Sequence, residues 1–542
     1  MFHQQIAPIG GNLALSTLVA ALPVAVVLVV LGVWRRPGWQ AALAGLGVAL
    51  LIAVGPWQMP AVLALDAVAF GATFALMPVI WIVVNALLVY NIAVRCGQFD
   101  ALCRWLRRHL PDDRRVVLIV VGFCFSALFE GISGFGTPVA IAGSLLILAG
   151  FEPLDALVYV LIFNTAPVAY GALGTPVTVL GAVTGLPAVS LGAMVGRQLP
   201  VIALVLPFYV IALYGGWRSV RALWPMLLVT GGSFALLQFV ASNFIDYTLT
   251  DVLSSLGSLL AALLFLRYWR PAPDPAHRLA PLSGNAGRDS LGASDMERGA
   301  GDARGWLPWL LLAAVVILWS SLKVPVLAQQ KIAWPGLHRA IAITLYDARP
   351  YDAWWNLQPF GTGTAILVAA VLIAMIAGLS VLQFIDCVIH TLRQYWRAAI
   401  TVMLIIGLAY LMNYAGLAYT LGKGVASTGS LFVLLSPFLG WLAVMLSGSD
   451  TSGNALFGNL QVVAAQQLQL SPVLFAATNS SGGVMGKMIS PQNIATGVAV
   501  TKLTGAEGCV FARTFVHSIV LTLLLGAWVA IQQFWIPGII PR

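Results

Sequence analysis

Long apolar runs recur along the whole chain and are separated by short polar stretches or by glycine and proline. Their apolar residues are continuous rather than alternating, which indicates membrane-spanning α-helices and excludes a transmembrane β-barrel. We therefore predict an all-α polytopic membrane protein with about 12 to 14 transmembrane helices, some of them broken or paired as re-entrant hairpins. The apolar runs lie near residues 13–33, 41–54, 61–94, 116–129, 137–150, 155–170, 177–195, 199–214, 222–242, 252–267, 306–322, 361–380, 398–416, 429–447, 455–467, 472–487 and 513–537.

Composition supports the same class, because only 9% of the 542 residues are charged, whereas about 25% are charged in a typical soluble domain. A secreted enzyme, a disulfide scaffold and a nucleic-acid-binding domain are therefore excluded. The net charge of +9 is explained by basic cytoplasmic loops, which also contact the lipid bilayer, without an acidic partner. The five cysteines are scattered without metal-ligand spacing, so we predict no metal and no cofactor.

The charged residues near the N-terminus predict an orientation. No lysine or arginine precedes the first apolar run, so this run is a retained span and not a signal peptide. Arg35 and Arg36 follow the run directly, and residues 95–115 form a second basic loop. The positive-inside rule places both loops in the cytoplasm and the N-terminus outside.

Three parts of the chain differ in composition. Residues 1–269 form a predicted N-terminal membrane repeat with a hairpin region at about 116–196, and residues 306–542 form a C-terminal one with a hairpin region at about 447–500. Residues 270–305 are rich in Pro, Gly, Ala, Ser and Asp, which predicts a flexible polar linker. Within the second repeat, the tryptophan-containing region 323–359 is expected to be an ordered segment at the membrane interface.

Landmarks in the two hairpin regions recur in the same order. Their offset is 319 residues (452 − 133, 472 − 153) and, after a four-residue gap, 315 residues (479 − 164, 486 − 171, 491 − 176). Paired interrupted segments in two halves point to the substrate site of a transporter. Free N–H groups at the broken helices favour a small anionic or polar solute. The paired landmarks are Ser133-Gly134 with Ser452-Gly453, Pro153 with Pro472, Asn164 with Asn479, Gly171 with Gly486, and Pro176 with Pro491.

Four blocks of the sequence carry a resemblance to a known family. They are FEGISGFGTPVAIA (129–142), NTAPVAYGALGTP (164–176), SGSDTSGNALF (447–457) and NSSGGVMGKMISPQNIA (479–495). In these blocks the chain resembles the L-lactate permease family. The resemblance implies a proton-coupled importer of 2-hydroxymonocarboxylates (L-lactate, D-lactate and glycolate) in the bacterial inner membrane. A homodimer is the expected assembly. A wider resemblance, to carboxylate transporters, implies inverted repeats and an elevator-like motion.

Glu130 and Asp450 are the candidate proton-coupling residues. Between Arg115 and Arg197 the only charged residues are Glu130, Glu152 and Asp155. Between Lys423 and Lys487 there is only Asp450. A carboxylate at membrane depth is costly unless it is paired or protonated. Alternatively, Glu130 lies near an interface or caps a broken helix, and Asp450 binds sodium or caps a half-helix.

The candidate substrate-binding residues combine one cation with small polar groups. Lys487 could pair with the substrate carboxylate, Asp450 or Glu130, or could snorkel to the interface. The polar groups could bind the substrate or simply hold helices together. Four acids near the ends of spans, Asp66, Asp246, Asp251 and Asp386, are expected at the interface. The candidates are Ser133, Gly134, Thr137, Asn164, Thr165, Thr175, Ser452, Asn454, Asn479, Ser480, Lys487 and Gln492.

Other functions fit these residues less well. A sodium-coupled carboxylate symporter of the same architecture is the main alternative, since hydroxyl- and carbonyl-rich breaks also suit Na⁺. An anion channel is less favoured, because two acids at paired breaks argue against a simple pore. The chain contains no Walker A, HExxH or GxSxG motif, and we predict that it is not an enzyme.

Overall fold

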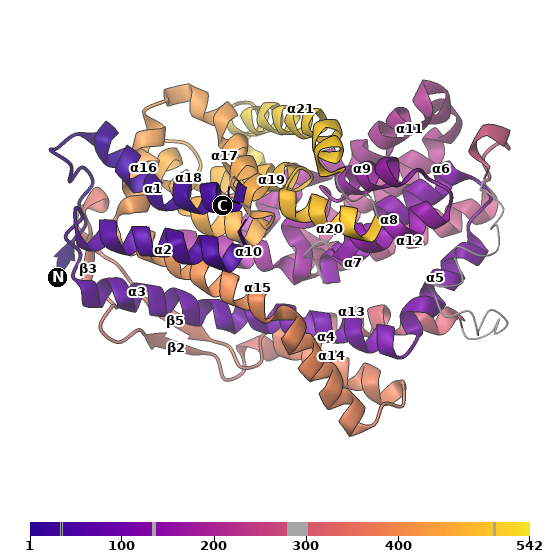
Figure 1. Cartoon of the computed structure of the whole chain (residues 1–542), viewed down its shortest axis with the longest axis horizontal. Helices are drawn as coiled ribbons and strands as arrows, with labels where there is room; N and C mark the ends of the chain where they lie inside the picture. Colours follow the sequence, from indigo (N-terminus) through magenta and orange to yellow (C-terminus); the bar gives the residue numbers. More distant parts are fainter. Residues whose placement is uncertain (33, 35, 133–136, 279–301, 502–505, 542) are drawn as a thin grey trace.

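The structure is a computed structural model that describes residues 1–32, 34, 36–132, 137–278, 302–501 and 506–541. Helices make up most of it (Figure 1). Those of the first half are α1 (Leu13–Gly32), α2 (Gly38–Val54), α3 (Ala61–Phe74), α4 (Trp81–Arg95), α5 (Gln98–His109), α6 (Arg114–Val117), α7 (Ser126–Ile132), α8 (Thr137–Leu148), α9 (Pro153–Phe163), α10 (Gly171–Thr184), α11 (Ala188–Val240) and α12 (Thr250–Tyr268). Those of the second half are α13 (Leu307–Ser321), α14 (Thr362–Ile376), α15 (Val381–Ala415), α16 (Leu417–Ala426), α17 (Phe432–Ser447), α18 (Asp450–Gln467), α19 (Pro472–Lys487), α20 (Pro491–Thr501) and α21 (Glu507–Phe534).

Many helices have the length and apolarity needed to cross a membrane. Among the described residues there are eight, and α9 with the bent segment Val168–Thr184 makes a ninth. Three further apolar helices are shorter, at 10–17 residues. The predicted all-α polytopic class is therefore confirmed. The number of about 12 to 14 spans and the two-fold repeat stay predictions.

Helix α11 is long enough for two crossings. Its 53 residues would extend about 80 Å at 1.5 Å per residue, whereas the hydrocarbon core is about 30 Å thick. The helix is broken at Gly216, where φ is +66° and ψ is −175°. Glycine accepts this conformation without the clash that a Cβ atom would cause. The break lies between the two spans predicted near 199–214 and 222–242.

The helices pack around two large hydrophobic cores. One core contains residues of α1 to α3 and α15, and α15 packs across both α2 and α3. In Figure 1 helices α1 to α3 lie on the left, whereas α8, α9, α11 and α12 lie on the right. The second core includes residues of α7, α9, α11, α12 and α19. Helix α10 packs against both α18 and α7 and contributes buried residues to both hydrophobic cores. It therefore joins the two cores.

The region 323–359 is ordered and contains short strands. Strand β2 (Gln330–Ala333) pairs antiparallel with β5 (Trp354–Leu357). Strand β3 (Ile341–Ile343) lies between β1 (Phe2–His3), to which it is parallel, and β4 (Arg349–Pro350), to which it is antiparallel. The ring of Trp334 packs on Phe70 of α3 at 5.1 Å between centroids. The predicted order of this segment is thus observed, and its place at the membrane interface stays a prediction.

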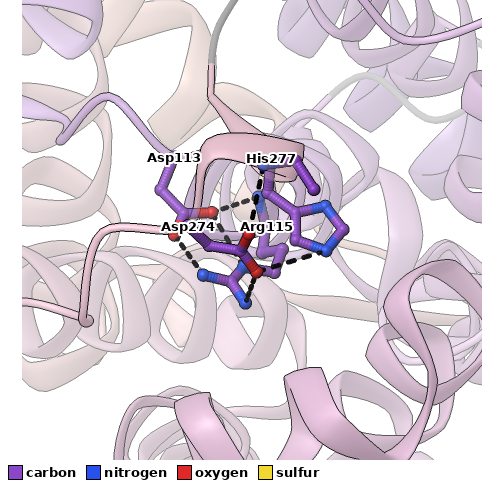
Figure 2. Close-up of polar contacts among 5 residues, drawn as sticks. Asp113, Arg115, Asp274 and His277 are labelled. Atoms are coloured by element: carbon purple, nitrogen blue, oxygen red, sulfur yellow. Dashed lines mark hydrogen bonds and ion pairs between the residues drawn. The ribbon is translucent and has the colours of Figure 1, made fainter.

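The predicted linker 270–305 is described only at its two ends, and residues 279–301 lie outside the described part of the chain. Its first end is docked on the N-terminal half (Figure 2). Arg115 donates from Nη2 to Asp113 Oδ2 at 2.7 Å and from Nη1 to Asp274 Oδ2 at 3.3 Å. His277 Nε2 lies 3.8 Å from the same Asp274 oxygen. These contacts fix residues 274–277 against α6, where the continuous helical stretch that contains Glu130 begins.

Candidate functional site

A buried ion pair joins the two halves of the chain. Lys487 Nζ donates to Glu130 Oε1 at 2.5 Å, and the two side chains are only 7% and 3% exposed. Asn164 Nδ2 donates to the other carboxylate oxygen, Oε2, at 3.0 Å. Of the alternatives considered for Lys487, the structure shows the pairing with Glu130. The Lys487 side chain turns into the protein rather than snorkelling, and Glu130 is buried among helices; the depth of Glu130 in the membrane stays a prediction.

The local sequence explains why these two groups are buried. Residues 115–132, which lead through α6 and α7 to Glu130, are all buried and almost entirely apolar. Lys487 is the last residue of α19, in a helix whose other side chains are small or apolar. Asn164 follows the last residue of α9 and keeps a helical backbone conformation. Three helix ends thus bring one cation, one carboxylate and one amide together.

Asp450 forms a second polar cluster at the start of α18. Its Oδ2 atom accepts hydrogen bonds from Ser480 Oγ at 2.5 Å and from Asn454 Nδ2 at 3.3 Å. Its Oδ1 atom is buried and has no hydrogen-bond partner among the described residues. Asp450 is not the cap of this helix, because Ser449 accepts the bond from the Ser452 amide at 3.3 Å. The carboxylate is therefore available for another role.

A small cavity of about 30 Å³ connects the two acids. This volume holds about two water molecules. Its walls come from α7, from the segment before and within α10, and from the regions around the start of α18 and the end of α19. The lining residues are Glu130, Val168, Gly171, Ala172, Pro176, Gly448, Ser449, Asp450, Thr451 and Lys487.

Two helix N-termini open near this cavity. The backbone of Ala172, Leu173 and Gly174 is left-handed, with φ of 45°, 55° and 72°, so the regular part of α10 begins only after Gly174. The other N-terminus is that of α18, which follows the left-handed Gly448 (φ +70°). Unpaired N–H groups and the positive end of the helix dipole attract anions. The predicted break at 171–176 is therefore observed. The break predicted at 447–454 is observed only at Gly448 and Ser449, because α17 ends at Ser447 and α18 begins at Asp450.

Several other predicted residues have different surroundings. Thr165 and Thr175 are buried, but their hydroxyls donate to the backbone oxygens of Ile162 and Ala172, each at 2.7 Å. Asn454 donates to Pro176 O at 3.2 Å and accepts from Asn479 at 2.9 Å. These groups hold the hairpins together, and their contact with a substrate stays a prediction.

The remaining candidates do not line the cavity or lie outside the residues that the structure describes. Ser452 is buried next to Asp450 and uses its amide to bond Ser449. Gln492 is exposed in a separate cavity and packs against Gly448. Ser133 and Gly134 lie outside the described residues, as does the side chain of Thr137 at the start of α8.

Comparison with known proteins identifies the family. The family described as L-lactate permease matches residues 16–536. An L-lactate permease of Bacillus subtilis is 40% identical over 568 residues, which cover 99% of each chain. A glycolate permease of Escherichia coli is 39% identical over 557 residues, again covering 99% of each chain. The chain belongs to the L-lactate permease family.

Membership has further consequences for the predictions. The relatives of this permease are transporters by name, which confirms that the chain is not an enzyme. They come from bacteria, so the chain is a bacterial membrane protein with a small-molecule substrate. Among solved structures, the YdaH transporter of Alcanivorax borkumensis matches with a TM-score of 0.44 and 16% identity, over 86% of each chain.

One predicted break in this permease is wrong. The paired landmarks predict an interrupted segment around Asn479 and Ser480, but α19 is continuous from Pro472 to Lys487. The glycines that follow them serve close packing instead. A Cβ atom on Gly482 or Gly486 would collide with backbone oxygens of α17. Small residues commonly allow such close approach between membrane helices.

Asp251, which was expected near the membrane interface, is buried within the protein at the start of α12, and its depth in the membrane stays a prediction. Asp251 is only 1% exposed and lies on α12, beside α7. The signal that could have located it is a polar stripe on an otherwise apolar helix, at spacings of three and four residues. This stripe consists of Asp251, Ser254, Ser255 and Ser258, all buried.

Proposed function

We propose that this chain is a secondary transporter that imports 2-hydroxymonocarboxylates by proton symport, with alternating access around the Glu130–Lys487 pair. L-lactate, D-lactate and glycolate are the proposed substrates, since the relatives are named for L-lactate and glycolate. The observation that carries the proposal is the buried ion pair of the two halves, which lines a cavity beside Asp450. Such a pair gives one cation for which a carboxylate substrate and Glu130 compete.

Competition for Lys487 couples the anion to a proton. When the substrate carboxylate binds the ammonium group, Glu130 loses its only charged partner among the described residues. An unpaired carboxylate in a buried site costs several kcal/mol, roughly, so the group takes up a proton instead. One proton therefore accompanies each anion. When the anion leaves, Glu130 releases the proton and pairs with Lys487 again.

The cavity supports a small anion. Lys487 supplies the charge, and the starts of α10 and α18 supply N–H groups. The hydroxyls of Ser449 and Thr451 also line the cavity and suit a 2-hydroxyl group. A volume of about 30 Å³ is close to that of two waters, so a three-carbon acid requires the walls to move apart. This is the opening that alternating access provides.

The remaining features of the proposal concern placement. We assign the chain to the inner membrane, with the N-terminus on the periplasmic side, because the basic loops 35–36 and 95–115 belong in the cytoplasm. Residues 1–269 and 306–542 are proposed as two inverted repeats, each with one hairpin region. A homodimer is the proposed assembly.

Uptake of labelled L-lactate into proteoliposomes, driven by a pH gradient in sodium-free buffer, tests the proposal. We expect accumulation that a protonophore abolishes. Glu130→Gln should lose uphill accumulation but retain lactate exchange, because a neutral amide resembles the protonated acid. The matched control is Glu152→Gln, since Glu152 is exposed and its side chain makes no capping bond; this variant should accumulate lactate normally.

Other results would change the assignment. Accumulation that requires external sodium would replace the proton by Na⁺ and withdraw the role of Glu130. Flux without saturation or counterflow would indicate an anion channel. Normal uphill uptake by Glu130→Gln would refute the coupling mechanism.

A further inference from the structure

Asp251 is a buried acid that the mechanism above does not use. Neither Oδ1 nor Oδ2 has a hydrogen-bond partner among the described residues. The nearby hydroxyls of α12 do not serve it, because they donate to backbone oxygens. These donors are Ser254 to Thr250 O at 2.7 Å, Ser255 to Asp251 O at 2.5 Å, and Ser258 to Thr230 O at 2.9 Å.

Asp251 packs against the residue next to Glu130. A Cβ atom placed on Gly131 would lie 2.6 Å from Asp251 Cβ, so only glycine allows this approach. Asp251 interacts electrostatically with both Glu130 and Lys487. It also interacts with the Tyr170 hydroxyl, which donates to Gly192 O at 2.6 Å. The side chain therefore belongs electrically to the same site.

On α11, which packs against α12, Arg197 is half-buried and donates to Asn243 Oδ1 at 2.8 Å, whereas Arg218 and Arg221 are exposed. Two titratable groups on other elements packed against α12 also have partners. Cys124, on the segment between α6 and α7, contacts Ser258 Oγ at 3.3 Å. Tyr247, before α12, contacts Thr178 Oγ1 at 3.1 Å. Neither group is a cation. Lys487 is thus the one buried cation near Asp251 in the described part of the chain.

The count of charges indicates the state of Asp251. Lys487 carries one positive charge, and Glu130 already pairs with it. A second carboxylate with no hydrogen bond would be an uncompensated charge in a dry interior, which is costly. Asp251 is therefore a neutral acid while Glu130 and Lys487 are paired. Asp251 thus holds a proton close to Glu130, which must gain one when the substrate anion binds Lys487.

We propose that Asp251 is a proton-relay residue that delivers the coupling proton to Glu130. This inference rests on the proposed proton symport. When the substrate anion takes Lys487, the O–H bond of Asp251 breaks and an O–H bond forms on Glu130. Asp251 then regains a proton from water on the side from which the substrate came. The sum is one proton taken up for each anion, with no other reactant.

Asp251→Asn tests the relay in the reconstituted full-length protein. The amide keeps the shape but cannot pass a proton, so we expect the initial rate of pH-driven lactate uptake to fall at least about tenfold. The final accumulation ratio should be unchanged, because Glu130 still couples the proton. Lactate–lactate exchange should stay within about twofold, since a second anion that replaces the first on Lys487 leaves the proton on Glu130. Asp246→Asn is the matched control, because Asp246 caps the turn by accepting from the amide and the hydroxyl of Thr248, and asparagine caps equally well.

The outcomes separate the relay from its alternatives. Normal initial uptake by Asp251→Asn would overturn the relay and leave proton symport intact. An equal loss of uptake and exchange would assign Asp251 a structural role and also overturn it. If the asparagine variant does not reach the membrane, Asp251→Ser is measured in the same two assays, with the same expectations. Failure of the wild-type protein to use a pH gradient would refute the proposed symport and the relay together.

Discussion

Replacing Lys487 by methionine removes the cation of the buried pair and keeps a long, flexible side chain. Glu130 is then left without its ion-pair partner in a site that is almost fully buried. Breaking a buried pair in this way costs about 3–5 kcal/mol. The carboxyl group can limit this cost by taking a proton. Protonating an ordinary glutamic acid at pH 7 costs about 3.7 kcal/mol, because its reference pKa is about 4.3 and each unit is worth about 1.36 kcal/mol.

The same arithmetic gives the pH dependence of the loss. At pH 5 the protonation cost is only about 1 kcal/mol. Lys487→Met should therefore lose about 3.7 kcal/mol relative to wild type at pH 7 and about 1 kcal/mol at pH 5. The free energy of unfolding of this variant should fall as the pH rises, because its native state keeps a proton on Glu130 that the unfolded state releases. Unfolding by SDS in mixed micelles, followed by tryptophan fluorescence, measures the difference.

Two further variants make this prediction sharp. Lys487→Met combined with Glu130→Gln has no buried charge to neutralise, so its stability should exceed that of Lys487→Met at pH 7 and depend less on pH. Lys331→Met, on the exposed strand β2, should change the free energy of unfolding by less than about 0.5 kcal/mol. A loss for Lys487→Met that is equal at both pH values would refute the reasoning, as would a double variant that is no more stable.

Two more variants probe the contacts around the acids. Gly171→Ala places a methyl group 2.8 Å from Glu130 Oε1, which must shift the carboxylate, so lactate uptake should fall at least about tenfold. The control is Gly232→Ala, whose new methyl group meets nothing closer than 4.0 Å and which should transport normally. Equal activities of the two variants would contradict the expectation. Ser480→Ala removes the shortest hydrogen bond to Asp450 and should lower the free energy of unfolding by about 1–3 kcal/mol. An unchanged unfolding curve would show that this hydrogen bond contributes nothing to stability.

The sequence predicts the charged residues of the site better than their partners. Glu130, Asp450 and Lys487 are conspicuous because each stands alone in a long uncharged stretch. The pairing of Glu130 with Lys487 was one of several alternatives, and the sequence could not select it, because 357 residues separate the two and only the packed fold brings them together. Asn164 was found through the glycine- and proline-rich break that follows it.

The mistaken break and the unforeseen burial of Asp251 have physical reasons of the same kind. Glycine pairs mark either a hinge or a close helix contact, and the sequence around Gly482 does not distinguish them; the neighbouring helix α17 does. Asp251 follows the polar stretch before a span, so its position along the chain suggested an interface. The burial of that position depends on α7, which covers it through Gly131.

On the proposed mechanism, the Glu130–Lys487 pair also determines how transport responds to membrane voltage. A potential of 100 mV does about 2.3 kcal/mol of work on one elementary charge that crosses the membrane. With the two side chains paired, the empty site carries no net charge from them. With an anion on Lys487 and a proton on Glu130, the loaded site is neutral as well. The membrane potential therefore does no work on either crossing of the bilayer, and the pH difference and the concentration gradient of the solute together drive transport.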